Sequence, residues 1–230
     1  MKIGELLNEA VKKHPEEFAI MAKIHKWRTK IASEKAATYS SWYPPFGKYK
    51  IVPYKGGGYG VEHLSENLKL YEWMFENGEL PFKFISCISL DVYGVNAMTT
   101  FKNFPDKVLN NSNGTMLNIF GVNSTMKGPN IHSLEGVPRH INGSADFSHF
   151  PKLSFANVHK HIDYVEGVKF PYPYKGPILG FLKINGLSSV TDHGDKWQQI
   201  LNKHLASSKR DAIACQRELI EKDLDEYAEF

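Results

Sequence analysis

A short apolar phrase occurs three times in the middle of the chain, and this repetition restricts the folds that the chain can adopt. Its copies are residues 90–96 (LDVYGVN), 117–123 (LNIFGVN) and, more loosely, 145–151 (ADFSHFP). They begin 27 and 28 residues apart. In each copy the apolar residues alternate with others, which predicts a short strand with one buried face.

A second phrase follows each copy of the first, at residues 100–108 (TFKNFPDKV), 133–141 (SLEGVPRHI) and 154–162 (SFANVHKHI). It holds an apolar residue, a Gly or Asn two positions on, another apolar residue and usually a Pro, which is typical of a turn. A single coil of this kind cannot bury its apolar face alone, so stacked neighbours must cover it. The sequence therefore predicts a solenoid whose outer strand face is available for binding.

The period is close to the roughly 20–29 residues of leucine-rich repeats. The pattern SLEGVP followed by ING (residues 133–143) resembles the degenerate leucine-rich-like repeats of an uncharacterised family of tailed-bacteriophage proteins, and residues 178–187 and 215–228 strengthen the resemblance. It covers a little over half of the chain and implies an architecture and a viral origin, but no activity. The copy is irregular, because its second phrases are 33 and 21 residues apart and His159 replaces the Pro. A short solenoid or a flatter sheet is expected.

Composition excludes several classes. With 230 residues, 42% of them hydrophobic, the chain can bury one core or a small helical domain packed on a repeat domain. A net charge of +3 is too balanced to indicate a nucleic-acid binder. Cys87 and Cys215 lie far apart in a chain without an obvious secretory leader, which favours reduced thiols in a cytoplasm. Since no apolar run reaches about 20 residues, membrane insertion is not expected.

These patterns predict an α+β fold, with a short irregular leucine-rich-like solenoid or sheet flanked by helical caps. Residues 1–80 form a helical domain with an aromatic and Gly-rich loop, 81–190 the repeat domain, and 191–230 a C-terminal helical cap. Within them we expect helices before residue 36, with a break at His14-Pro15, and over 61–77, with Asn77-Gly78 as the C-cap. Residues 178–184 are expected to be the last strand. Asp195 and Asp211 are expected to begin the two final helices.

The first helix has a basic face formed by Lys23, Lys26 and Lys30, with Arg28 nearby. This face either touches phosphates or an acidic partner, or is simply solvated while the helix docks on the core. Residues 211–230 carry seven acidic and two basic residues. We expect the basic first helix and the acidic last one to attract each other, within the molecule or between neighbours in an assembly, and we prefer this to nucleic-acid binding.

An aromatic loop over residues 37–60 supplies the other binding candidates, Trp42, Tyr43, Phe46, Tyr54 and Tyr59. Such residues stack bases or sugars or anchor protein interfaces, unless they pack against the first repeat. The Gly-rich segment 55–60 lacks the Gly-Lys-Ser/Thr ending of a phosphate-binding loop and the spacing of a dinucleotide fingerprint. It is expected to be a mobile flap or a hairpin turn.

Histidines are the only hint of chemistry. His159 and His161 would share one side of a strand, and His149 on the preceding unit could approach them, with Asp146 or Asp163 nearby. The alternative is that all are surface or turn residues. The segment 192–195 (DHGD) is read as a helix cap, and Cys87 as a buried, inert thiol. We therefore assign no catalytic residue, metal or cofactor.

The sequence predicts a non-enzymatic protein-interaction protein of a tailed phage. Its partner would be a virion component, which makes it a structural or decoration protein with scope for self-assembly, or a host factor. It would act in the virion or the host cytoplasm. The alternative is a nucleic-acid-binding protein or a metal-dependent hydrolase that uses the histidine cluster.

Overall fold

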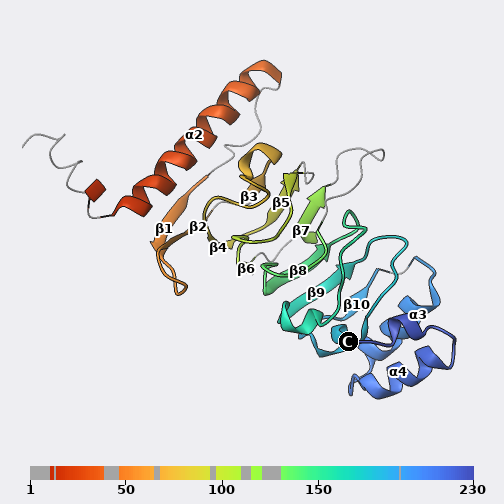
Figure 1. Ribbon diagram of the computed structural model, residues 1–230. Coiled ribbons are helices and arrows are strands. Elements are labelled where there is room, and N and C mark those ends of the chain that lie inside the picture. The colour runs from red at the N-terminus through yellow and green to blue at the C-terminus, as the bar shows by residue number, and fades with distance from the viewer. Residues whose placement is uncertain are drawn as a thin grey trace, which may run out of the picture.

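The chain forms a β-solenoid of about four turns with helices at both ends (Figure 1). The computed structural model describes residues 11–12, 14–38, 47–64, 68–93, 97–109, 115–120, 131–191 and 193–230. The helices are α2 (Pro15–Thr38), α3 (Lys196–Ala206) and α4 (Ala212–Ile220), with short 3-10 segments η1 (Glu72–Met74), η3 (Val158–Lys160), η4 (Leu179–Lys183) and η5 (Asp225–Tyr227). The strands are β1 (Tyr49–Pro53), β2 (Tyr59–His63), β3 (Leu68–Leu70), β4 (Phe84–Cys87), β5 (Leu90–Tyr93), β6 (Lys107–Val108), β7 (Thr115–Phe120), β8 (His140–Asp146), β9 (Tyr164–Lys169) and β10 (Ser189–Val190).

Each coil crosses the sheet as two consecutive strand segments, so the sheet has two parallel columns. The first column contains β2, β4 and β6, the second contains β3, β5 and β7, and both converge on β8 and β9. In the second column Leu90 is paired with Leu117, and Leu117 with Ala145. These are the residues that begin the three copies of the first phrase. The strands predicted in the first two copies are therefore confirmed, whereas in the third copy β8 ends at Asp146 and residues 147–150 form a turn.

The second phrase is a tight turn, as predicted. Its Gly or Asn has a positive φ, which a Gly tolerates without strain and Asn tolerates better than most residues. The apolar residues on either side are buried and joined by a backbone hydrogen bond across the turn. The turns are Phe101–Phe104 around Asn103 (φ 66°), Leu134–Val137 around Gly136 (φ 83°), and Phe155–Val158 around Asn157 (φ 55°).

Stacking of the coils brings their aromatic residues into one continuous core. Phe155, for example, is fully buried, and its ring centroid lies 4.9 Å from that of Phe170 and 5.5 Å from that of Phe147. Burying a side chain of this size contributes about 1.5–3 kcal/mol to the free energy of unfolding. The other fully buried phenylalanines among the described residues are Phe84, Phe101, Phe104, Phe147, Phe150, Phe170 and Phe181.

The N-terminal end of the solenoid is covered by α2 and an antiparallel hairpin. Helix α2 begins at Pro15, as predicted, and buries Ile24, Trp27 and Ile31 against the first coil. The ring centroid of Trp27 lies 5.1 Å from that of Phe82. Strands β1 and β2 pair antiparallel, so the Gly-rich segment between them is a hairpin turn. This cover removes the exposed apolar face that the first coil would otherwise present.

The helix predicted over residues 61–77 is wrong. Those residues include the end of β2, all of β3 and η1. The backbone N–H of Leu68 donates to Ser89 O at 2.9 Å, and this pairing with a distant strand overrides the helical spacing of the apolar residues. Asn77 and Gly78 both have positive φ and join two bridged residues in a turn, rather than ending a helix. The sheet thus begins at Tyr49, before the boundary expected near residue 80.

The strand predicted over residues 178–184 is also wrong, because this stretch contains η4. Its apolar residues do not alternate, and Leu179, Gly180, Phe181 and Leu182 are all buried. The backbone N–H of Ile178 donates to Tyr227 O at 3.2 Å, so the segment is tied to the C-terminal residues. Its uninterrupted apolar run reflects burial on all sides and not a place in the sheet.

Helices α3 and α4 form the C-terminal cap, with Asp195 and Asp211 at their N-cap positions, as predicted. The side-chain amide of Asn202 in α3 pairs with both backbone groups of Val190, at 2.7 and 3.0 Å. Helices α2 and α4 lie at opposite ends of the solenoid (Figure 1). The prediction that they attract each other within one molecule is therefore wrong. Lys23 of α2 forms an ion pair with Glu76 of the first coil instead.

Candidate functional site

The outer face of the sheet carries rows of polar residues, because the coil register places equivalent residues side by side. Backbone pairing links positions 69, 91, 118, 146 and 169 in one row, whose charged residues are Lys69, Asp91, Asp146 and Lys169, with Asp91 buried. Lys169 Nζ donates to Asp146 Oδ2 at 3.1 Å. Opposite charges on adjacent strands stabilise the pairing. We call this set the charged row.

A hollow of about 180 Å³ lies at the end of the charged row, on β8, β9 and β10. Ser144, Ser189 and Thr191 line it together with the Asp146–Lys169 ion pair. A Cβ atom on Gly167 would lie 2.6 Å from Ser144 Oγ, so the absence of a side chain there preserves this close approach. The hollow is therefore polar, with hydroxyl groups and both charges at its wall.

Electrostatics keep the Asp146 carboxylate ionised. Burial acts to raise its pKa, but the hydrogen bonds from Ser148 and Lys169 outweigh burial and hold the pKa below its usual value. One of these bonds comes from the backbone N–H of Ser148, at 2.8 Å. The hollow thus presents a fixed carboxylate beside a lysine ammonium.

A second row consists of the residues at which successive coils enter the sheet. These residues are Lys107, His140, Tyr164 and Asn185. The rings of His140 and Tyr164 are stacked, with centroids 4.7 Å apart and planes 18° from parallel. The imidazole Nε2 of His140 lies 2.9 Å from Asn142 Oδ1. We call this set the His140–Tyr164 row; it places a flat, partly exposed aromatic pair at the start of β8 and β9, the strands that also line the polar hollow.

The basic residues predicted on the first helix mostly contact the protein's own first coil. Lys23 pairs with Glu76, and Lys30 Nζ lies 4.5 Å from the centre of the Trp73 ring. Arg28 lies over the Tyr49 ring and donates to Gly47 O at 2.7 Å. Lys26 is exposed. The structure therefore favours the docked-helix interpretation over a free phosphate-binding face.

The aromatic loop is only partly described. Trp42, Tyr43 and Phe46 lie outside the described residues. Tyr59 packs against the core, and its hydroxyl lies 3.0 Å from His14 Nδ1. Tyr54 is partly buried in the hairpin turn and lies against Gly56. The two described aromatic candidates thus belong to the β1–β2 hairpin and do not form a separate platform.

The histidine candidates lie on turns. His159 belongs to η3, so it and His161 do not alternate along a strand as expected, and His149 is exposed in a turn. The pKa of His159 is lowered, first by burial and then by the charge of Lys183. Among the residues that the structure describes, no group of three or more His, Cys, Asp or Glu could hold a metal ion. Of the neighbouring carboxylates, Asp163 is bound by Arg139.

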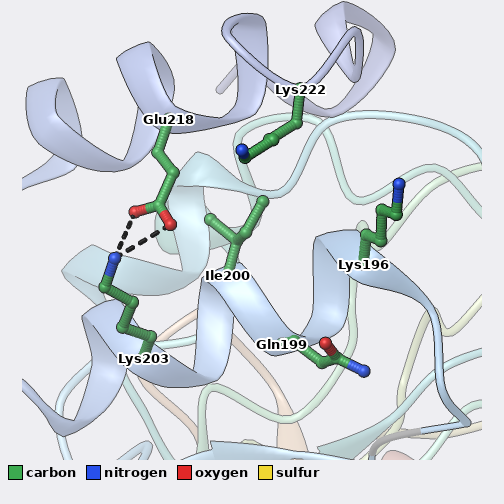
Figure 2. Close-up of a pocket in the computed structure, with 6 residues that line it drawn as sticks. All are labelled: Lys196, Gln199, Ile200, Lys203, Glu218 and Lys222. Carbon is green, nitrogen blue, oxygen red and sulfur yellow. Dashed lines mark hydrogen bonds and ion pairs between the residues drawn. The ribbon is translucent and has the colours of Figure 1, made fainter.

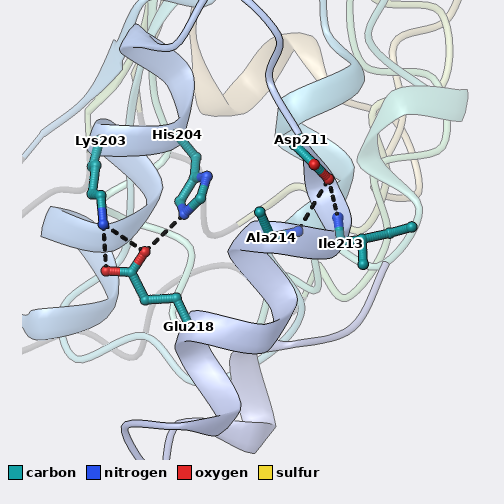
Figure 3. Close-up of polar contacts among 6 residues, drawn as sticks. All are labelled: Lys203, His204, Asp211, Ile213, Ala214 and Glu218. Carbon is teal, nitrogen blue, oxygen red and sulfur yellow. Dashed lines mark hydrogen bonds and ion pairs between the residues drawn. The ribbon is translucent and has the colours of Figure 1, made fainter.

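The structure also shows a cavity that the sequence had not indicated. It measures about 320 Å³ and lies between α3 and α4, lined by Lys196, Gln199, Ile200, Lys203, Glu218 and Lys222 (Figure 2). The Glu218 carboxylate accepts hydrogen bonds from Lys203 Nζ at 2.8 Å and pairs with His204 Nε2 at 2.9 Å (Figure 3). These two partners, Lys203 first, lower the pKa of Glu218. The spacing of Lys196, Gln199 and Lys203 on one helical face was the available signal.

Neither cysteine is suited to nucleophilic chemistry. Both Cys87 and Cys215 are buried free thiols, which confirms the prediction for Cys87. Burial raises the pKa of both thiols, to about 12 for Cys215, so the reactive thiolate is scarce at neutral pH.

Comparisons with known proteins give no match to any family model, curated protein or solved structure. None of the helices in the described part of the chain is long and apolar enough to cross a membrane.

Proposed function

We propose that the protein is a non-enzymatic interaction protein that binds a protein partner through the outer face of its sheet. The observation that carries the proposal is that the charged row, the polar hollow and the His140–Tyr164 row share strands β8 and β9. A parallel sheet holds such side chains at a fixed spacing of about 4.8 Å between strands. The face therefore offers a pre-organised pattern of charges, hydroxyl groups and an aromatic pair.

The chemistry of this face favours a protein over the alternatives. Exposed aromatic rings beside charged and hydroxyl groups are typical of protein interfaces. In the charged row Lys69 and Lys169 are matched by Asp91 and Asp146, so the row has no excess of positive charge for a phosphate backbone, which disfavours nucleic acid. A metal-dependent hydrolase has little support, since no group of three or more His, Cys, Asp or Glu among the described residues could hold a metal ion.

The proposal includes the origin that the repeat pattern suggests, a tailed phage. The partner is then a virion protein or a host protein. Mass spectrometry of purified particles and of infected-cell lysate distinguishes the two. A stoichiometric amount in the particle supports a structural or decoration role, whereas presence in the lysate alone supports a host-directed binder.

A site-specific photo-crosslinker in place of Tyr164 tests the interface itself. We expect a defined adduct with one protein in infected cells, lost when Lys169→Glu reverses a charge in the neighbouring row. The control places the same crosslinker at Glu135, an exposed residue of a turn outside the sheet. Absence of an adduct at position 164, or the same adduct from position 135, would overturn the proposal.

A further inference from the structure

The cavity between α3 and α4 has the composition of an anion site. Lys196 and Lys203 flank Ile200 on α3, while Lys222 reaches in from the α4 side (Figure 2). Its volume of about 320 Å³ is at the lower end of the roughly 300–1,000 Å³ of small-molecule sites. A small ligand would thus fill it.

The charges that line the cavity do not balance. Three lysine ammonium groups face one carboxylate, that of Glu218. This carboxylate already binds Lys203 and His204, so it is engaged within the cap (Figure 3). Lys196 and Lys222 are both exposed, and each adds a positive charge at the mouth. The cavity therefore carries an excess of positive charge that suits a ligand with at least two negative charges.

We propose that this cavity binds a small organic phosphate, with Lys196, Lys203 and Lys222 around the phosphate oxygens and Ile200 against the organic part. Phosphate has several strong acceptor oxygens, and lysine binds it as a point charge that needs no fixed geometry. Ile200 is buried to 7% exposure and provides an apolar floor, while the Gln199 amide offers both a donor and an acceptor. This site is separate from the sheet face and does not depend on the function proposed for it.

The effect of replacing Glu218 distinguishes an anion site from a cation site, because the two predict opposite changes in affinity. As the cavity's one carboxylate, it repels an anionic ligand and competes with it for the Lys203 ammonium, which Glu218 binds at 2.8 Å. Glu218→Gln removes this charge and releases Lys203. Anion affinity should therefore rise in this variant, whereas a site for cations would lose affinity.

Isothermal titration calorimetry of the full chain with ADP and with inorganic pyrophosphate tests the proposal. We expect saturable binding that weakens at high salt. Lys196→Gln and Lys222→Gln should each weaken it by about three- to tenfold, the effect of about one charge-assisted contact. Glu218→Gln should strengthen it. The matched control is Lys209→Gln, which removes the same charge from an exposed loop residue that does not line the cavity.

Two outcomes would overturn the proposal. One is no saturable heat with either probe. The other is an equal loss of affinity in Lys209→Gln, Lys196→Gln and Lys222→Gln, which would mean diffuse attraction to any surface lysine and not a site. Lys196 and Lys222 are exposed, so their variants should unfold at the same temperature as the wild type. Thermal unfolding therefore checks that each variant is folded.

Discussion

Arg139 and Asp163 form a two-point ion pair between adjacent coils, with Nε 2.8 Å from Oδ2 and Nη2 2.6 Å from Oδ1. They directly precede His140 and Tyr164, which are paired in β8 and β9. Lys83 and Asp106 occupy the equivalent place two coils earlier and form an ion pair through a single contact, with Nζ 2.6 Å from Oδ1. Alternating charges therefore mark the start of the coils along the solenoid.

The Arg139–Asp163 pair should make a small, pH-dependent contribution to stability. The hydrogen bond from Arg139 lowers the pKa of Asp163, so the contribution is complete above the unfolded-state pKa of about 3.9 and is lost as pH falls through the folded-state value. Both side chains are about half exposed, at 54% and 52%. Asp163→Asn should therefore cost no more than about 1 kcal/mol at pH 7. Urea unfolding at pH 7 and below about pH 3 checks this, and a cost that persists in acid would contradict it.

Gly136 should be the least replaceable of the turn residues. Its φ is +83°, and a Cβ atom would lie 2.7 Å from Phe101 O, a backbone atom of the neighbouring turn. Gly136→Ala should lower the free energy of unfolding by about 2–3 kcal/mol. Asn157→Gly at the equivalent place, where φ is 55°, should change it by less than about 1 kcal/mol. Urea denaturation measures both, and an alanine variant as stable as the wild type would refute the argument.

The two C-terminal helices offer a matched test of capping. The Asp211 carboxylate accepts from the backbone N–H groups of Ile213 and Ala214 at 2.9 and 3.0 Å (Figure 3). Asp195 has the same position on α3, but its side chain makes no capping hydrogen bond. Asp211→Ala should therefore cost about 1 kcal/mol, and Asp195→Ala clearly less. Thermal unfolding of both variants gives the comparison, and equal shifts would count against the assignment.

The thiols should be unreactive in the folded protein. Burial raises the pKa of Cys87 and Cys215, so neither should react with Ellman's reagent at pH 8 on the time scale of minutes. Both should react fully once the chain is unfolded in guanidinium chloride. Rapid reaction of either thiol under native conditions would show that its end of the solenoid opens readily.

The sequence predicted those parts of the fold whose pattern is local and repeated. The alternation after Leu90 recurs after Leu117, the turn residue Asn103 recurs as Gly136, and each recurrence supports the others. Residues 61–77 have no such copy. Their apolar spacing suits a helix, but residues 68–70 form strand β3 because they pair with the distant strand β5.

The candidate sites were less predictable, because they depend on contacts between elements. The hollow at Gly167 needs the register of β8, β9 and β10, and the lysine cavity needs the packing of α3 on α4. The basic face of the first helix was visible in the sequence. Its partners Glu76 and Trp73 were not, because they lie more than 40 residues along the chain.

The carboxamide of Asn202 occupies both backbone groups of Val190, as the peptide group of a following strand would. Arg210 binds the carbonyl oxygen of Ile184 at 2.7 Å, at the start of the same last coil. At the other end, α2 and the β1–β2 hairpin cover the first coil. Descendants of this chain can therefore gain or lose whole coils only in its interior, where each coil meets a neighbour of its own kind, while both ends must be inherited intact.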